Sequence, residues 1–95
     1  MSSESQVHDN KTRNRFELVI DGVTAFAEYE TADGVVTLTH TEVPDRLGGR
    51  GVGSALARGA LDALRRDGRK VAATCPFMAA FLKKHSEYND LTTAA

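Results

Sequence analysis

The chain has 95 residues, a formal net charge of −1 and a single cysteine, so it fits one domain. One cysteine, Cys75, excludes an internal disulfide and a metal site made of several cysteines, and we expect no metal and a reducing, cytoplasmic setting. No apolar run is long enough to span a membrane, and residues 1–14 lack the apolar core of a secretory signal, so we expect no membrane association.

The first half of the chain predicts an antiparallel three-stranded meander. Residues 1–14 are polar without hydrophobic periodicity, which indicates a disordered tail before one domain over residues 15–95. Apolar and β-branched residues then predict strands over 16–20, 23–30 and 35–40. The pairs Asp21-Gly22 and Asp33-Gly34 separate these strands and are typical of tight hairpin turns.

The second half predicts a helix, a strand and a helix. Apolar residues at helical spacing favour a helix over 52–67, which Gly68 ends as a left-handed cap. A strand over 70–74 follows, and its connection through a helix predicts parallel pairing with the sheet. A shorter helix is predicted over 77–85, just after Pro76, with the core candidates Phe77, Met78, Phe81 and Leu82. The fold class is therefore α/β (α+β), with a mixed sheet.

The formal charge is divided unevenly along the chain. Residues 16–45 hold seven acidic side chains and no lysine or arginine, whereas residues 46–70 hold seven basic side chains and two acidic ones. The basic half includes the glycine run and is suited to attract an anion, although a solvated helix face explains most such charge runs. Because the net charge is negative and aromatics do not alternate with bases, we expect no nucleic acid partner.

The run Gly48-Gly49-Arg50-Gly51-Val52-Gly53-Ser54 directly precedes the first predicted helix. Glycines let the backbone approach a ligand closely, and the first N–H groups of a helix have no partner within it. Together with the helix dipole, these groups form an anion site that phosphate commonly occupies. The run therefore predicts a site for a phosphorylated ligand, the alternative being a glycine-rich helix entry without one.

Two common phosphate-binding motifs do not match this run. A nucleotide P-loop places Lys before Ser or Thr, but here Ser54 stands where the Lys should be. A dinucleotide-binding loop follows a strand directly, and an acidic residue ends the next strand. Pro44 and several further residues intervene here, and the next strand ends at Thr74-Cys75.

The run resembles the Gln/Arg-x-x-Gly-x-Gly/Ala motif of the GCN5-related N-acetyltransferases, with Gly48 in the place of the usual Arg or Gln. The segments Cys75-Pro76-Phe77 and 85–91 (His-Ser-Glu-Tyr-Asn-Asp-Leu) narrow the resemblance to very short acetyltransferase-like members, over nearly all of residues 15–95. The resemblance implies a minimal form of that family's fold, binding of acetyl-CoA or coenzyme A, and transfer of acetyl to a primary amine on a small molecule or a protein lysine. It does not identify the acceptor, and a dimer or a partner protein could complete the acceptor site.

The resemblance also implies a set of cofactor-binding residues. The loop would hold the pyrophosphate of coenzyme A, basic side chains would reach its phosphates, and the third predicted strand would offer backbone groups to the pantetheine arm. The implied residues are Leu38, Thr39, Gly48, Gly49, Arg50, Gly51, Val52, Gly53, Ser54, Arg58 and Lys83.

Four residues are candidates for catalysis. Cys75 ends the fourth predicted strand, where the family places the thioester, and a helix start beside it lowers a thiol pKa. It could carry the acetyl group covalently, or be a buried, inert thiol. For direct transfer, His40 or Glu42 could accept the proton of the amine. The resemblance implies that Phe81 stands where many relatives have a tyrosine that protonates the leaving thiolate, so Tyr88 or Cys75 is a candidate substitute. A non-catalytic module that binds coenzyme A is the alternative function, and an α/β domain without a cofactor is a third.

Overall fold

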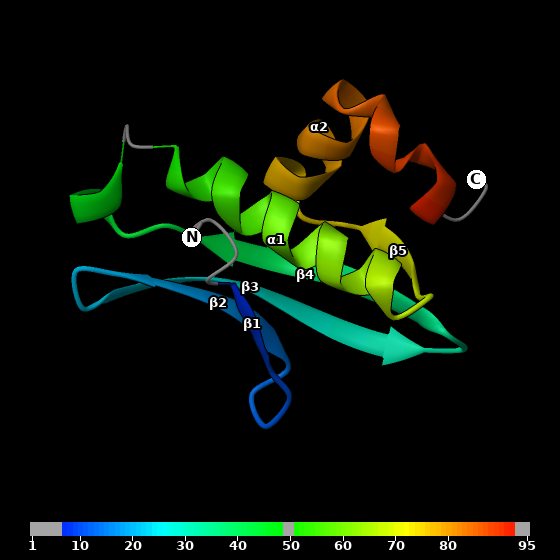
Figure 1. The fold of residues 1–95 in the computed structure, drawn as a ribbon, viewed down its shortest axis with the longest axis horizontal. Helices are drawn as coiled ribbons and strands as arrows, with labels where there is room; N and C mark the ends of the chain where they lie inside the picture. The colour runs from blue at the N-terminus through cyan, green and yellow to red at the C-terminus, as the bar shows by residue number, and fades with distance from the viewer. Residues whose placement is uncertain (1–6, 49–50, 93–95) are drawn as a thin grey trace.

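The computed structural model describes residues 7–48 and 51–92. Its sheet has five strands in the order β1-β2-β3-β4-β5, all antiparallel to their neighbours except the parallel pair β4–β5 (Figure 1). The strands are β1 (His8–Asn10), β2 (Arg15–Ile20), β3 (Val23–Ala32), β4 (Val35–Glu42) and β5 (Lys70–Ala73). The mixed sheet and the expected fold class are confirmed.

The hairpin turns of the meander form where the Asp-Gly pairs predicted them. Asp21 and Gly22 have φ values of 53° and 77°, and Asp33 and Gly34 have 54° and 78°. Two successive positive φ angles are the geometry of a type I′ turn, whose twist matches that of the strands it joins. These turns fix the pairing of β2 with β3 and of β3 with β4.

Helix α1 (Val52–Arg66) connects β4 to β5 and packs on β2 and β3. It ends as the sequence predicts, with Gly68 at φ 70°. The N–H of Gly68 donates to the carbonyl of Arg65 at 3.1 Å, and the N–H of Arg69 donates to that of Leu64 at 2.9 Å. These two bonds make a Schellman motif, which satisfies carbonyls at the helix end and turns the chain into β5.

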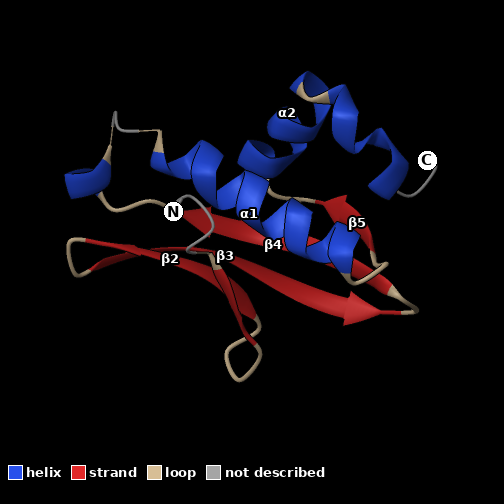
Figure 2. Cartoon of the chain, in the orientation of Figure 1, coloured by secondary structure: helices blue, strands red, loops and turns tan. Residues whose placement is uncertain are grey.

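Helix α2 (Pro76–Lys84) and two 3-10 helices, η1 (Asp45–Leu47) and η2 (Ser86–Leu91), complete the fold. Figure 2 shows α1 and α2 on the same side of the sheet, with no helix drawn on the opposite side. We call that opposite side the open face. Among the described residues, no helix is long and apolar enough to cross a membrane.

The core lies between the sheet and the helices. Fully buried side chains from β2, β4, η1, α1, β5 and α2 meet there: Phe16, Val36, Leu38, Leu47, Leu56, Leu61, Val71 and Met78. Of the four core candidates in α2, Met78 and Phe81 are buried and Leu82 is partly buried. Phe77 is 41% exposed, so its assignment to the core is wrong. It occupies the first turn of α2, one turn before Phe81 on the same side of the helix, so helical spacing alone did not reveal its exposure.

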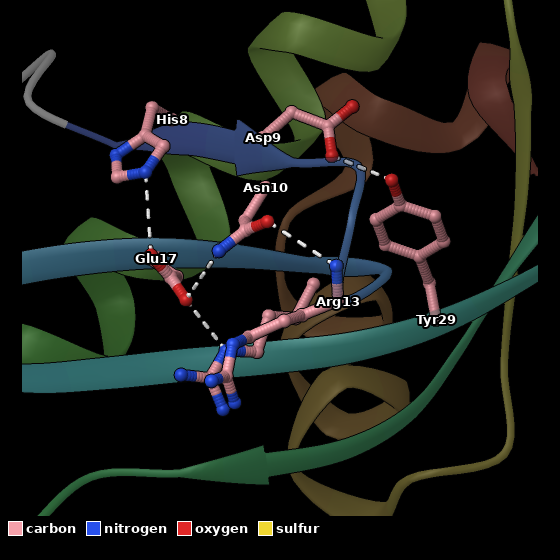
Figure 3. A network of polar contacts seen from close by, with 7 residues as sticks. His8, Asp9, Asn10, Arg13, Glu17 and Tyr29 are labelled. Atoms are coloured by element: carbon pink, nitrogen blue, oxygen red, sulfur yellow. Dashed lines mark hydrogen bonds and ion pairs between the residues drawn. The ribbon is translucent and has the colours of Figure 1, made fainter.

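The prediction of a disordered tail is wrong for its second half, because His8–Asn10 form the edge strand β1. Side chains hold this polar strand (Figure 3). Asn10 donates to Glu17 at 3.1 Å, and the Tyr29 hydroxyl donates to Asp9 at 2.5 Å. Burial and this bond raise the pKa of Tyr29 to about 12. Residues 1–6 of the expected tail lie outside the described residues.

A β-bulge near the end of β4 decides which face its last residues occupy. Tyr29 lies opposite Leu38, and Glu28 lies opposite His40, which leaves Thr39 without a directly opposite residue on β3. Because directly opposite residues share a face, the extra residue reverses the alternation beyond it. Leu38 points toward the helices, whereas His40 and Glu42 lie on the open face.

Candidate functional site

The start of α1 is open to a ligand. Gly51 is its N-cap in the left-handed conformation, with φ 71° and ψ 16°, and no side chain of the described residues caps this helix start. The first intrahelical bond is that from the N–H of Ala55 to the carbonyl of Gly51, at 3.0 Å. The preceding N–H groups, of Val52, Gly53 and Ser54, have no helical acceptor and form the anion-binding end of the dipole.

Three glycines of the run also have structural reasons for being glycine. Gly51 needs its positive φ. A Cβ on Gly48 would lie 3.2 Å from the carbonyl oxygen of Asp45, and a Cβ on Gly53 would lie 2.9 Å from the Phe77 ring. Glycine at these positions is therefore not evidence for phosphate by itself. Gly49 and Arg50 lie outside the described residues, so the expected roles of these two stay predictions.

A cavity of about 470 Å³ extends from this helix start along the outer side of α1. Val7 forms one wall and packs against α1 at Gly59, where any side chain would overlap with it. The other lining residues are Gly51, Ser54, Ala55, Arg58, Asp62 and Arg66. The cavity thus joins the free N–H groups to two guanidinium groups, and these suit an anionic ligand with more than one phosphate.

Strands β4 and β5 separate beyond their last paired residues, Leu38 and Ala73. The carbonyl of Leu38 accepts the N–H groups of Thr74 and Cys75 at 3.0 and 3.2 Å, so it is already engaged, and its side chain is buried. Beyond this point, residues 39–42 continue β4 without pairing to β5. Their backbone groups on that side, including those of Thr39, are the ones placed to meet a ligand in the gap.

Cys75 lies at this gap as the N-cap of α2 and is 5% exposed. Its Sγ donates to the hydroxyl of Thr41 at 3.3 Å. Burial raises the pKa of the thiol, but the Thr41 side chain and the backbone N–H groups of Met78 and Phe77 lower it more, so the pKa falls below its usual value. A helix start and a hydroxyl beside the sulfur favour the thiolate, which is the nucleophilic form of a cysteine side chain.

His40 and Glu42 lie on the open face, and Thr41 between them faces the helix side. The imidazole Nε2 of His40 is 3.2 Å from a carboxylate oxygen of Glu42, and these side chains are 55% and 58% exposed. The His40 ring lies 6.2 Å from that of Phe26. The structure therefore brings His40 and Glu42 together, on the opposite side of β4 from the contact between Cys75 and Thr41.

The other expected site residues lie elsewhere. The Tyr88 hydroxyl donates to Asp62 at 3.0 Å, and burial followed by this bond raises its pKa. Tyr88 follows the far end of α2, a helix about 13 Å long, so the structure does not bring it to Cys75. Arg58 lines the cavity and pairs with Glu87 at 3.4 Å, whereas Lys83 is exposed near the end of α2 and is not a lining residue.

Sequence reasoning missed Thr41 and Arg66. Thr41 stands between two candidates, but regular alternation from Leu38 would place it on the open face, and only the bulge brings it to Cys75. Arg66 is one of several basic residues in this helix. It follows Arg58 by eight residues, and this spacing could have indicated that the two lie on one side of the helix.

The sheet separates between its parallel strands β4 and β5, beside a helix with an open, glycine-led start. The family profile described as GCN5-related N-acetyl-transferase matches residues 15–91. The chain belongs to this GCN5-related N-acetyltransferase family, as the motif resemblance predicted.

Relatives and a solved structure agree with this assignment. The chain is 34% identical to Protein NATD1 of Gallus gallus over 83 residues, which is 84% of this chain and 76% of that protein. It is 32% identical to Protein NATD1 of Homo sapiens over 83 residues, or 84% and 74% of the two chains. The solution NMR structure of a GCN5-like protein from Staphylococcus aureus superposes with a TM-score of 0.73 and 28% identity, covering 99% of this chain and 93% of that one.

Proposed function

We propose that this protein transfers the acetyl group of acetyl-CoA to a primary amine, and that Cys75 carries the acetyl group between the two. The observation that carries the proposal is the environment of Cys75. Its sulfur lies at the gap between β4 and β5, contacts Thr41 at 3.3 Å and begins α2, in a chain of acetyltransferase fold. An inert core thiol would not need a helix start and a hydroxyl beside it.

The residues around α1 fit coenzyme A. The uncapped N–H groups of Val52, Gly53 and Ser54 suit its pyrophosphate. The adjoining cavity suits its phosphoadenosine end, with Arg58 and Arg66 for the remaining phosphate. When bound, acetyl-CoA supplies an acetyl group already activated as a thioester.

In the first half-reaction, the thiolate of Cys75 bonds to the carbonyl carbon of the acetyl group. The bond from that carbon to the donor sulfur breaks, and the donor sulfur leaves with the electron pair. The Thr41 hydroxyl, which donates to the sulfur once it is ionised, holds Cys75 in position. S-acetylated Cys75 results.

In the second half-reaction, the amine bonds to this same carbon and the bond from carbon to Cys75 sulfur breaks, which restores the thiolate. The amine must lose a proton, and His40, supported by Glu42, is the proposed acceptor. Because His40 lies on the open face, the amine would arrive from that side of β4 and reach the acetyl carbon through the gap between β4 and β5. Glu28, opposite His40, adds negative charge that favours a cationic amine.

Intact-mass spectrometry after incubation with acetyl-CoA tests this proposal. We expect a gain of about 42 Da in the unmodified protein and none in Cys75→Ala, followed by loss of the adduct when an amine panel is added. Cys75→Ala should still bind coenzyme A. A protein that turns over amines without any Cys75-dependent adduct would contradict the covalent route and favour direct transfer with His40 as the base.

A non-catalytic module that binds coenzyme A is the second candidate. It is favoured by the composition of α2, which offers no hydroxyl or imidazole to protonate a leaving thiolate, and by the engagement of Tyr88 with Asp62. Coenzyme A at 100 times its Kd should stabilise either protein by about 2.7 kcal/mol. Release of free thiol from acetyl-CoA in the presence of amines distinguishes the enzyme from the module.

A further inference from the structure

Phe77 leaves a large apolar surface in water beside the candidate site. Among the described residues, Phe77 and Val19 are the large apolar side chains that are exposed, at 41% and 49%. Val19 lies near the end of β2 on the open face, whereas Phe77 lies two residues after Cys75 in the first turn of α2. Exposing an aromatic ring forgoes the stabilisation that its burial would provide. A ligand that covered it would recover part of this free energy.

The Phe77 ring leans on the start of α1. A Cβ placed on Gly53 would lie 2.9 Å from the tip of the ring, and 3.4 and 3.6 Å from the two adjacent ring carbons. Gly53 is the second residue of α1, and its N–H is one of the free donors of that helix start. The ring therefore occupies the space that a side chain at this position would fill.

The ring thus lies between two points that the proposed function connects. One is the start of α1, which suits the pyrophosphate, and the other is the sulfur of Cys75, which receives the acetyl group. The part of coenzyme A that must run between them is the pantetheine arm, whose branched dimethyl segment is apolar. An exposed aromatic ring is a suitable surface for such a segment.

We propose that Phe77 is a positioning residue whose ring binds the apolar segment of the pantetheine arm and directs the thioester toward Cys75. This proposal rests on the proposed binding of coenzyme A. Gly53 then has a role apart from phosphate contact, because its missing side chain lets the ring reach this place. The Cys-Pro-Phe segment combines the nucleophile, the helix start and the apolar contact in three consecutive residues.

Isothermal titration calorimetry with two ligands tests the proposal. Coenzyme A carries the pantetheine arm, and 3′-phospho-ADP is the same molecule without it. For Phe77→Ala we expect the Kd for coenzyme A to rise roughly tenfold and that for 3′-phospho-ADP to stay unchanged. Val19→Ala, a matched loss of an exposed apolar side chain on the other face, should change neither value.

Gly53→Ala supplies a second, coupled measurement. Its methyl group would displace the ring, so it should weaken coenzyme A binding in the normal background and much less in Phe77→Ala. Melting curves of each variant verify that it is folded. If Phe77→Ala proves unstable, Phe77→Ser gives the same comparison, because it also removes the apolar ring and because serine is well tolerated at a helix start.

The outcomes separate this proposal from the one on which it rests. If the unmodified protein binds neither ligand, the proposed function fails and the role of Phe77 fails with it. If the protein binds coenzyme A but Phe77→Ala binds both ligands normally, or loses affinity for both equally, the pantetheine contact is refuted while the proposed function stands. An equal loss would mean that the ring only supports the helix start.

Discussion

Two glycines at opposite ends of α1 allow the effect of a positive φ on stability to be separated from an effect on ligand binding. Gly51 and Gly68 have φ values of 71° and 70°, and a Cβ on either would meet nothing within 4 Å. They are separated by α1 itself, about 22 Å of helix. Gly51 begins the helix at the proposed phosphate site, whereas Gly68 ends it in the Schellman motif, away from that site.

Replacing either glycine by alanine should destabilise the protein equally. A left-handed L-residue costs roughly 1–2 kcal/mol. Restriction of the unfolded chain offsets roughly 0.4–1 kcal/mol of this cost. The net loss is then about 1 kcal/mol, which lowers the melting temperature of a domain of this size by about 4–8 °C. Asparagine tolerates the left-handed region better, so Gly51→Asn should lose less stability than Gly51→Ala.

Binding should distinguish the two positions. A methyl group on Gly51 projects into the space that the phosphate must enter, so we expect the Kd for coenzyme A to rise roughly tenfold in Gly51→Ala and to stay unchanged in Gly68→Ala. Thermal melting and calorimetry on the same samples measure both effects. If the two variants lose the same stability and also bind coenzyme A with the same Kd, a close approach of phosphate at Gly51 is refuted.

Three further predictions concern two side chains around the site and one, Glu17, in the polar network between β1 and β2. Arg66→Glu should raise the Kd for coenzyme A roughly ten- to a hundredfold and leave that for dephospho-coenzyme A nearly unchanged in calorimetry, with Arg69→Glu as the control of equal charge. Tyr88→Phe should lower the free energy of unfolding by about 0.5–1.5 kcal/mol without changing acetylation of Cys75, and slowed acetylation would instead support a catalytic Tyr88. Glu17→Gln should lower the free energy of unfolding, measured with urea at neutral pH, by roughly 1–3 kcal/mol.

The pH dependence of that last difference follows from the pKa of Glu17. The hydrogen bond from Arg15 holds this pKa below 4.5, the ordinary value of a glutamate side chain, in the folded protein. The unfolded chain therefore takes up a proton first as the pH falls, so the stabilisation is present above about 4.5 and is lost as the pH falls through the folded value. Urea unfolding of the two proteins from pH 7 to pH 3 should show the difference shrinking toward zero. A constant difference would mean that the lost stability does not depend on the charge.

Elements held by local patterns could be predicted from the sequence. The Asp-Gly pairs predicted both hairpins, and helical spacing with Gly68 predicted α1 to within a residue of its end. The parallel pairing of β5 with β4 could be predicted because a helix connects the two strands, and such a crossover joins parallel strands. The glycine motif and the two C-terminal segments identified the family, because they are local as well.

The rest depends on contacts between residues far apart in the chain. Strand β1 has no apolar pattern and is held by Asn10 and Asp9 through partners 7 and 20 residues away. The place of the Phe77 ring against α1 depends on a glycine in that other helix. The proximity of Cys75 and Thr41, 34 residues apart, depends on an irregularity in a strand that looks regular in sequence.

The bulge at Thr39 changes the phase of β4, so one irregularity decides the sidedness of the site. If the same residues paired without it, the imidazole would turn toward the helices and the threonine hydroxyl toward water. Loss of the Thr39 codon alone would remove the bulge but leave His40 opposite Glu28 and Thr41 opposite Ala27, so the surroundings of the thiol and of the incoming amine would keep their faces. Two family members that differ by one residue in this segment can therefore place the same residues at equivalent positions in space, provided that the gap in their alignment falls at the bulge.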